Sequence, residues 1–99
     1  MSIESNTVKH AAYAKLESEI ETAEAKLQTL KARAKAAKAN AEIVVIADLL
    51  TRKEELQLKL QELKKAGAER WARAKADLEA LIADFEKSVK EIEAKVKAL

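Results

Sequence analysis

The chain contains no cysteine, no proline and a single glycine, Gly67. Without cysteine it has no disulfide framework, no thiolate nucleophile and no cysteine-based zinc site. The absence of cysteine also fits the cytoplasm, where disulfides are rare. Proline and glycine are the residues that most often interrupt helices, and they are nearly missing here. The sequence therefore predicts long helices with very few breaks.

Aromatic residues and long apolar runs are also scarce. Tyr13, Trp71 and Phe85 are the only aromatic residues, too few for a base-stacking surface on single-stranded nucleic acid. The longest apolar run covers residues 43–47, whereas a bilayer-spanning helix needs roughly 20 apolar residues. Residues 1–7 lack the apolar stretch of a signal peptide. We therefore expect a soluble, cytoplasmic protein with no membrane partner.

No pattern of catalytic or metal-binding residues is present in the sequence. His10 is the only histidine, so it would have to act as the general base for any serine nucleophile such as Ser18 or Ser88. The Glu-x-x-His motif of di-metal sites in helical bundles is absent, and so is a glycine-rich phosphate loop. We therefore expect no enzyme activity, no catalytic, cofactor-binding or metal-binding residues, and no cofactor.

The residues that dominate the chain are strong helix formers. Ala, Glu, Lys, Leu and Arg make up two thirds of the sequence, and about half already indicates a coiled coil or long helix. The 19 basic and 17 acidic residues leave a net charge of only +2. Such a balance is typical of a solvated helix surface rather than of a strongly basic nucleic-acid binder. The composition predicts an all-α, coiled-coil protein.

Apolar residues recur at alternating spacings of three and four, which is the seam of a coiled coil. One seam contains Tyr13, Leu16, Ile20, Ala23, Leu27, Leu30, Ala34, Ala37, Ala41 and Val44. A second contains Ile46, Leu49, Lys53, Leu56, Leu60 and Leu63. A third contains Trp71, Lys75, Leu78, Ile82, Phe85, Val89, Ile92, Val96 and Leu99. We expect the stems of the two seam lysines to pack while their ammonium groups reach water or a carboxylate.

The polar residues before Val8 predict where the first helix begins. Ser5, Asn6 and Thr7 can each accept a hydrogen bond from a free backbone N–H group. We therefore expect a helix from about Thr7, preceded by a disordered tail over residues 1–6. Residues 7–99 then form a single helical domain.

A helix ending is predicted before Gly67. Lys64 and Lys65 place cations in the last turn, and a glycine can adopt the left-handed conformation that often follows a helix. A second helix is expected over about 68–98, with Trp71 closing the end of the bundle against the Leu60–Leu63 region.

The segment around Asn40 leaves two architectures open. In the first, one helix of roughly 90 Å runs over residues 7–65, the second helix folds back along half of it, and an antiparallel second copy covers the rest. In the second, a turn near Asn40 produces a monomeric up-down-up three-helix bundle. The seam changes phase between Val44 and Ile46, and a continuous helix would absorb that change as stutters. We favour the first architecture because no helix breaker stands near Asn40.

The helical-hairpin architecture predicts a homodimer. Residues 43–50 are apolar around most of the helix, which requires burial on more than one side. The expected self-association residues are Leu16, Ile20, Leu27, Leu30, Ala34, Ala37, Ala41, Val44, Val45 and Leu49. This architecture predicts a structural or interaction protein that self-associates through its Leu/Ala seam, with a further protein partner as an extension.

A basic segment provides an alternative function. Residues 25–41 contain five basic residues and no acidic ones. Lys31, Arg33, Lys35 and Lys38 are its candidate anion-binding residues, with nucleic acid or phosphate as the less favoured partner. Alanines rather than bulky apolar residues stand opposite the lysines, which does not suit a membrane-surface helix.

Parts of the sequence resemble a group of short bacterial coiled-coil proteins that are linked to stress responses or uncharacterised. The resemblance lies in the stretch 59–67, Trp71, and the segments 75–78 and 85–87, with a similar Ala/Lys-rich segment at 32–41. It covers about residues 15–90 and implies a bacterial cytoplasmic protein with a stress-linked, non-catalytic role. The composition also fits a designed or engineered helical bundle.

Overall fold

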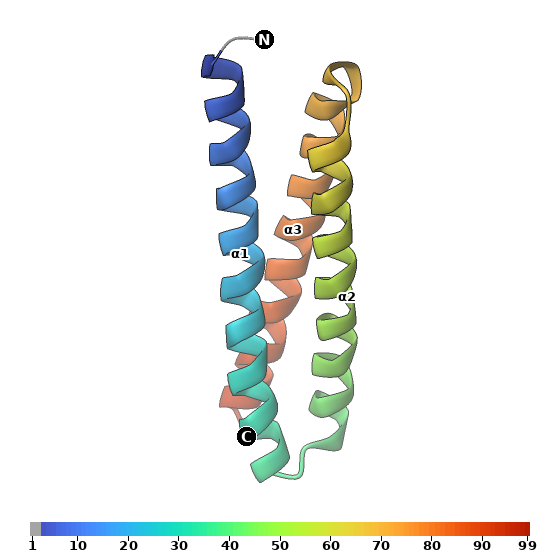
Figure 1. The fold of residues 1–99 in the computed structure, drawn as a ribbon. Helices are drawn as coiled ribbons and strands as arrows, with labels where there is room; N and C mark the ends of the chain where they lie inside the picture. The colour runs from blue at the N-terminus through green and yellow to red at the C-terminus, as the bar shows by residue number, and fades with distance from the viewer. Residues whose placement is uncertain (1–2) are drawn as a thin grey trace.

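The computed structural model describes residues 3–99, and the side chains of residues 8–99. Three helices, α1 (Ile3–Ala36), α2 (Asn40–Lys65) and α3 (Ala68–Lys97), follow one another along the chain. They run up, down and up as a bundle 54 Å long and 18 by 16 Å across (Figure 1). No strand occurs in this part of the chain. The prediction of an all-α protein is confirmed.

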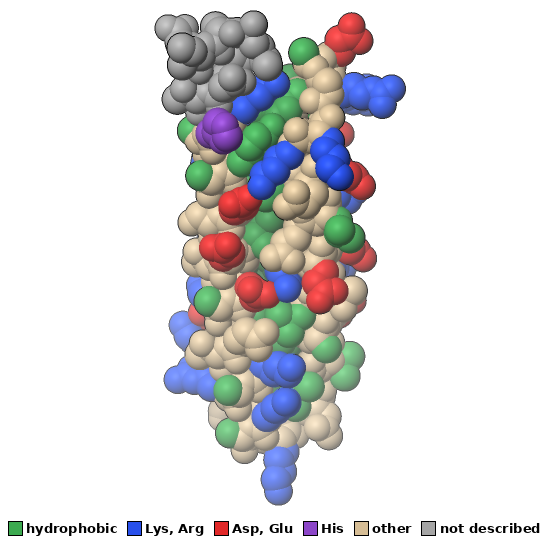
Figure 2. Space-filling model, viewed as in Figure 1, with side chains coloured by type: hydrophobic (Ala, Val, Ile, Leu, Met, Phe, Trp, Pro, Cys, Tyr) green, Lys and Arg blue, Asp and Glu red, His purple; other side chains and the backbone are tan. Residues whose placement is uncertain are grey.

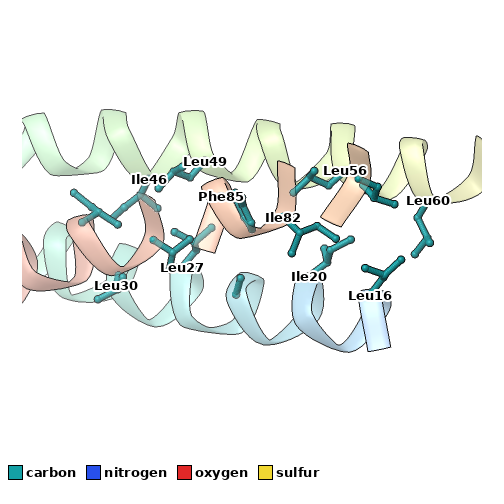
Figure 3. Close-up of a cluster of buried hydrophobic side chains, with 14 of the residues drawn as sticks. Leu16, Ile20, Leu27, Leu30, Ile46, Leu49, Leu56, Leu60, Ile82 and Phe85 are labelled. Atoms are coloured by element: carbon teal, nitrogen blue, oxygen red, sulfur yellow. The ribbon is translucent and has the colours of Figure 1, made fainter. Parts of the chain in front are cut away.

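One hydrophobic core runs the length of the bundle, because the three apolar seams point toward a common axis (Figure 3). Phe85 is the largest of its fully buried side chains. α1 contributes Leu16, Ile20, Ala23, Leu27, Leu30 and Ala34; α2 contributes Ile46, Leu49, Leu56, Leu60 and Leu63; α3 contributes Leu78, Ile82, Phe85, Val89, Ile92 and Val96. The seams predicted from the spacing therefore supply the core of a single chain. The predicted seam positions Ala37, Ala41, Val44 and Leu99 are exposed instead.

The chain turns at residues 37–39 instead of continuing as one helix. The expected long helix over residues 7–65 is therefore wrong, and the alternative three-helix bundle describes the structure. Asn40 does not end a helix; it is the first residue of α2. The phase change between Val44 and Ile46 thus reflects a new helix rather than a stutter.

The turn is built by backbone hydrogen bonds in a Schellman motif. The amide of Ala39 donates to the carbonyl of Ala34 at 2.9 Å, and the amide of Lys38 donates to that of Lys35 at 3.0 Å. Lys38 has a φ of 56°, the left-handed conformation that this motif requires and that glycine usually supplies. Ala39 then forms an inverse γ-turn, since the amide of Asn40 donates to the carbonyl of Lys38 at 3.1 Å.

Packing explains why the chain turns at residues 37–39 instead of continuing as one helix. α2 folds back so that Ile46 and Leu49 lie in the same core as Leu27 of α1. All three side chains are at most 2% exposed. The apolar seam of α1 is therefore covered by its own chain and needs no second copy, while helix propensity alone does not distinguish the two architectures.

The second break lies where the sequence predicts it. α2 ends at Lys65 and α3 begins at Ala68. Gly67, however, is extended, with φ −70° and ψ 164°, so the expected left-handed conformation is not adopted there. A β-carbon at Gly67 would meet no atom within 4 Å. The break therefore does not depend on the conformational freedom of glycine.

The first helix begins earlier than expected. α1 starts at Ile3, four residues before the start predicted at Thr7. The rest of the predicted tail, residues 1–2, lies outside the described residues.

Candidate interaction surfaces

The structure divides the residues that were expected to mediate self-association. Leu16, Ile20, Leu27, Leu30, Ala34 and Leu49 are buried in the core of the monomer. Ala37, Ala41, Val44 and Val45 are exposed. Only the second group is available to another molecule while the bundle stays folded.

Two large apolar side chains stand out on the exposed face of α2. Val44 is 68% exposed and Leu58 is 65% exposed. They are fourteen residues apart, with Thr51 midway between them and also exposed. Spacings of seven residues return to the same helix face. Val44 and Leu58 therefore lie on one line along α2, which we call the outer row.

Leu58 was not among the predicted site residues. It stands between the core residues Leu56 and Leu60 and is out of phase with both. An apolar residue out of phase with its own seam was the signal available in the sequence.

A groove of about 600 Å³ runs between α1 and α2 on this side of the molecule. Leu58 and three carboxylates, from Glu17, Glu21 and Glu54, line it, together with Gln57, Gln61, Ile20 and Leu60. Figure 2 shows this face: acidic side chains lie near the middle of its length, and Lys and Arg side chains lie toward both ends. The groove is therefore partly apolar and carries separated charges.

Two ion pairs cross from α1 to α2. Lys53 lies 2.5 Å from Glu24, and Lys64 lies 2.5 Å from Glu17. The Lys53 side chain is only 12% exposed, so its stem packs in the seam while its ammonium group reaches a carboxylate. These contacts confirm the expectation for Lys53, and they show which levels of the two helices lie side by side.

Lys75, the other seam lysine, behaves in the same way. Its ammonium group lies 3.4 Å from Glu79, one turn further along α3. It also lies 5.9 Å from the centre of the Trp71 ring. The stem of Lys75 therefore packs in the seam, while its ammonium group interacts with the Glu79 carboxylate and the Trp71 ring.

The basic segment does not form one surface. Lys31 and Lys35 are one turn apart on the side of α1 toward α2, whereas Arg33 lines a groove of about 500 Å³ between α1 and α3. Lys38 is exposed in the turn. Among the described residues, none of these four side chains forms an ion pair.

The groove beside Arg33 also contains residues from the end of α3. Lys26 and Lys97 line it, and both reach Glu93, at 3.5 and 3.8 Å. α1 and α3 end at the same end of the bundle (Figure 1). The fold thus adds Lys97 of α3 to the basic end, which sequence spacing could not reveal.

The opposite end of the bundle is closed by an aromatic pair. The indole Nε1 of Trp71 donates to the hydroxyl of Tyr13 at 2.8 Å, and the rings meet edge to face at 6.4 Å. Lys9 lies 5.3 Å from the Trp71 ring centre, and Lys64 lies 5.7 Å from that of Tyr13. Trp71 therefore closes this end through Tyr13 of α1 and through packing against the core.

No cluster suited to metal binding or membrane insertion occurs in the part of the chain that the structure describes. No group of three or more histidine, aspartate or glutamate side chains could hold a metal ion among these residues. His10, at the surface, meets the ring of Tyr13 at 6.5 Å. No helix within residues 3–99 is long and apolar enough to cross a bilayer.

The chain matches no protein-family model, no curated protein and no solved structure. The resemblance to short bacterial stress-linked proteins therefore stays a prediction.

Proposed function

We propose that this chain is a non-enzymatic structural and interaction protein that self-associates as a folded bundle, with the homodimer as its working unit. The observation that carries the proposal is the exposure of Val44 and Leu58 on one face of α2. Isolated apolar residues are common on protein surfaces. Here two of them share one face of a helix, and one of the two, Leu58, also lines a groove. A cytoplasmic location and a stress-linked role are part of this proposal.

The proposed contact differs from the seam contact expected from the sequence. The seam residues are already buried within the monomer, so the association we propose uses the outer row and the groove beside Leu58. The bundle does not have to open, and its three helices stay in place. The unit therefore keeps its closed core and presents Val44 and Leu58 on its outer face.

Sedimentation velocity over a hundredfold range of protein concentration tests this proposal. We expect a species of twice the 10.9 kDa chain mass at the higher concentrations, and it should persist in high salt because apolar burial is not screened. The double variant Val44→Lys/Leu58→Lys should stay monomeric. A monomer at every concentration for the natural sequence would contradict self-association.

The matched control is Leu81→Lys. Leu81 is 42% exposed and lines the separate groove between α2 and α3. The Leu81→Lys variant carries the same kind of substitution on another face of the bundle, so this variant should dimerise like the natural sequence. Equal loss of association in this control would indicate that added charge, rather than the outer row, prevents assembly.

A second candidate function is anion binding at the basic end. Arg33, Lys26 and Lys97 converge on one groove, and Glu93 is the only carboxylate that lines it among the described side chains, residues 8–99. Three cations around one acid leave a positive local charge, which attracts phosphate groups.

Fluorescence anisotropy with a labelled oligonucleotide tests the second candidate. Binding through phosphates should fall steeply between about 50 and 200 mM salt, and the double variant Arg33→Ala/Lys97→Ala should weaken it. Binding that is unaffected by salt or by this variant would contradict phosphate recognition at this end.

A further inference from the structure

One row of charged residues on α1 changes sign at its middle. Glu17, Glu21 and Glu24 lie on the side of α1 that faces α2: Glu17 and Glu21 line the shared groove, and Glu24 pairs with Lys53. Seven residues after Glu21 comes Gln28, and seven after Gln28 comes Lys35. Seven residues after Glu24 comes Lys31, and seven after Lys31 comes Lys38, in the turn. The row is acidic before Gln28, where Glu17 and Glu24 also pair with Lys64 and Lys53 of α2, and basic after it.

The two halves of the row match in their distances from Gln28 and are opposite in sign. Glu21 and Lys35 are each seven residues from Gln28. Glu24 and Lys31 flank it at four and three residues, and Glu17 and Lys38 lie further out at nearly equal separations. A row with this symmetry is complementary to a copy of itself that runs in the opposite direction.

We propose that the α1–α2 face binds a second copy of this chain antiparallel, with α1 against α1 and α2 against α2. The two-fold axis lies in the interface, runs across the helices and passes level with Gln28 of α1 and Thr51 of α2. The proposal rests on the self-association proposed above and specifies its face, direction and register. In this arrangement the acidic half of each α1 lies against the basic half of the other.

The outer row of α2 independently indicates the same axis. Val44 and Leu58 are each seven residues from Thr51, so a two-fold axis at Thr51 places Leu58 of one copy against Val44 of the other. These are the two most exposed large apolar side chains on α2. Each would cover the other, which removes both from water.

The two axis positions lie within about 3 Å of the same height in the bundle, at a rise of 1.5 Å per residue. Because α1 and α2 are antiparallel, the ion pairs Glu24–Lys53 and Glu17–Lys64 set their relative levels. Gln28 is four residues beyond Glu24, and Thr51 is two residues before Lys53. The step from Glu24 to Gln28 and the step from Lys53 back to Thr51 both lead toward the end of the bundle where α1 finishes. One axis therefore serves the charge row of α1 and the outer row of α2.

A parallel arrangement would oppose these features. With α1 against α1 of a parallel second copy, each charge of the α1 row would meet its own copy, and like charges in contact are destabilising. Two unfavourable contacts remain in the antiparallel register. Lys64, beside Glu17, lies level with Lys38 of the second copy, where Glu17 offsets it. Asp48 lies level with Glu54 of the second copy, and Arg52 pairs with Asp48 at 3.5 Å and offsets it.

Charge-reversal variants test the register. Glu17→Lys/Glu21→Lys makes the row basic in both halves except at Glu24, and Lys35→Glu/Lys38→Glu makes it acidic except at Lys31. Each variant alone should dimerise about tenfold more weakly or worse, since attractive pairs become repulsive. A mixture of the two should form a heterodimer close in affinity to the natural homodimer, because the reversed charges are again complementary.

The matched controls carry the same charge changes on the α1–α3 side. Glu19→Lys/Glu86→Lys and Arg33→Glu/Lys97→Glu alter residues that line grooves there, and they should dimerise like the natural sequence. Circular dichroism on every variant confirms that the bundle is folded before association is measured.

Single cysteines test the direction, and the chain has no cysteine of its own to interfere. Gln28→Cys lies near the axis and should form an intermolecular disulfide on mild oxidation. Lys35→Cys should not, because antiparallel copies hold these positions roughly 20 Å apart at 1.5 Å per residue, beyond disulfide reach. Efficient cross-linking of both variants would indicate a parallel dimer and overturn the proposal.

The outcomes separate the two proposals. If the natural sequence dimerises but the charge variants associate as it does, the antiparallel register is wrong and self-association stands. If the natural sequence is monomeric throughout, both proposals fail.

Discussion

Leu27 illustrates how individual residues hold this bundle together. Its side chain is 0% exposed and lies where all three helices meet. The whole bundle is only 16–18 Å across, and a single buried cluster with residues from all three helices fills its interior. Single side chains in such a thin core therefore carry a large part of the stability.

Replacing Leu27 with alanine should lower the free energy of unfolding by about 2–5 kcal/mol, because it removes buried methyl groups and leaves a cavity. Denaturant titration measures the loss. The control Lys15→Ala, at an exposed position of the same helix, should change stability by less than about 0.5 kcal/mol. Similar values for the two variants would contradict the burial of Leu27.

Tyr13→Phe removes the hydroxyl that accepts a hydrogen bond from Trp71. We expect a loss of about 0.5–1.5 kcal/mol, the usual contribution of one such bond. A double-mutant cycle followed by circular dichroism isolates the bond, since Tyr13→Phe should cost less when Trp71 is already phenylalanine. An equal cost in both backgrounds would show that the hydroxyl contributes through other contacts.

At the scale of helices and turns, the break between α1 and α2 depends on a residue type that does not favour it. Lys38 adopts a left-handed conformation at φ 56°, which costs a side-chain-bearing residue roughly 1–2 kcal/mol. The hydrogen bonds of the turn and the packing of Ala39 against the core compensate for that cost. The only glycine stands instead at an extended residue between α2 and α3.

Lys38→Gly should therefore stabilise the protein, by roughly 0.5–1 kcal/mol once the larger entropy of glycine in the unfolded chain is included. Lys35→Gly, one turn earlier within α1, is the matched control and should destabilise it by up to about 1 kcal/mol. Thermal denaturation distinguishes the two. Destabilisation by both substitutions would instead indicate a helix that continues through Lys38.

For the whole molecule, one continuous core implies that the three helices unfold together. All of them contribute to the same buried cluster, so removing any helix would expose the seams of the other two. Trp71, the only tryptophan, reports on one end of the bundle, whereas circular dichroism reports on every helix.

We expect denaturation curves from Trp71 fluorescence and from circular dichroism to coincide, as they do for a two-state transition. The Leu27→Ala variant, whose substitution lies away from Trp71, should shift both curves equally. A fluorescence transition at lower denaturant than the helical one would show that the Trp71 end opens separately.

Much of the architecture could be predicted from the sequence. Spacings of three and four identify the core residues of every helix, and Lys64, Lys65 and Gly67 mark the second break. The role of Lys53 also follows from its place in a seam. These features depend on local composition and periodicity, which the sequence contains directly.

The first turn and the surface sites could not be predicted in this way. Residues 32–41 are strong helix formers, so a continuous helix and a turn both agree with their propensities; the return of Ile46 and Leu49 onto Leu27 decides between them. That contact joins residues about twenty positions apart and exists only in the folded bundle. The same folding leaves Val44 and Leu58 at the surface and sets Gln28 level with Thr51, because only tertiary packing determines which helix faces remain uncovered.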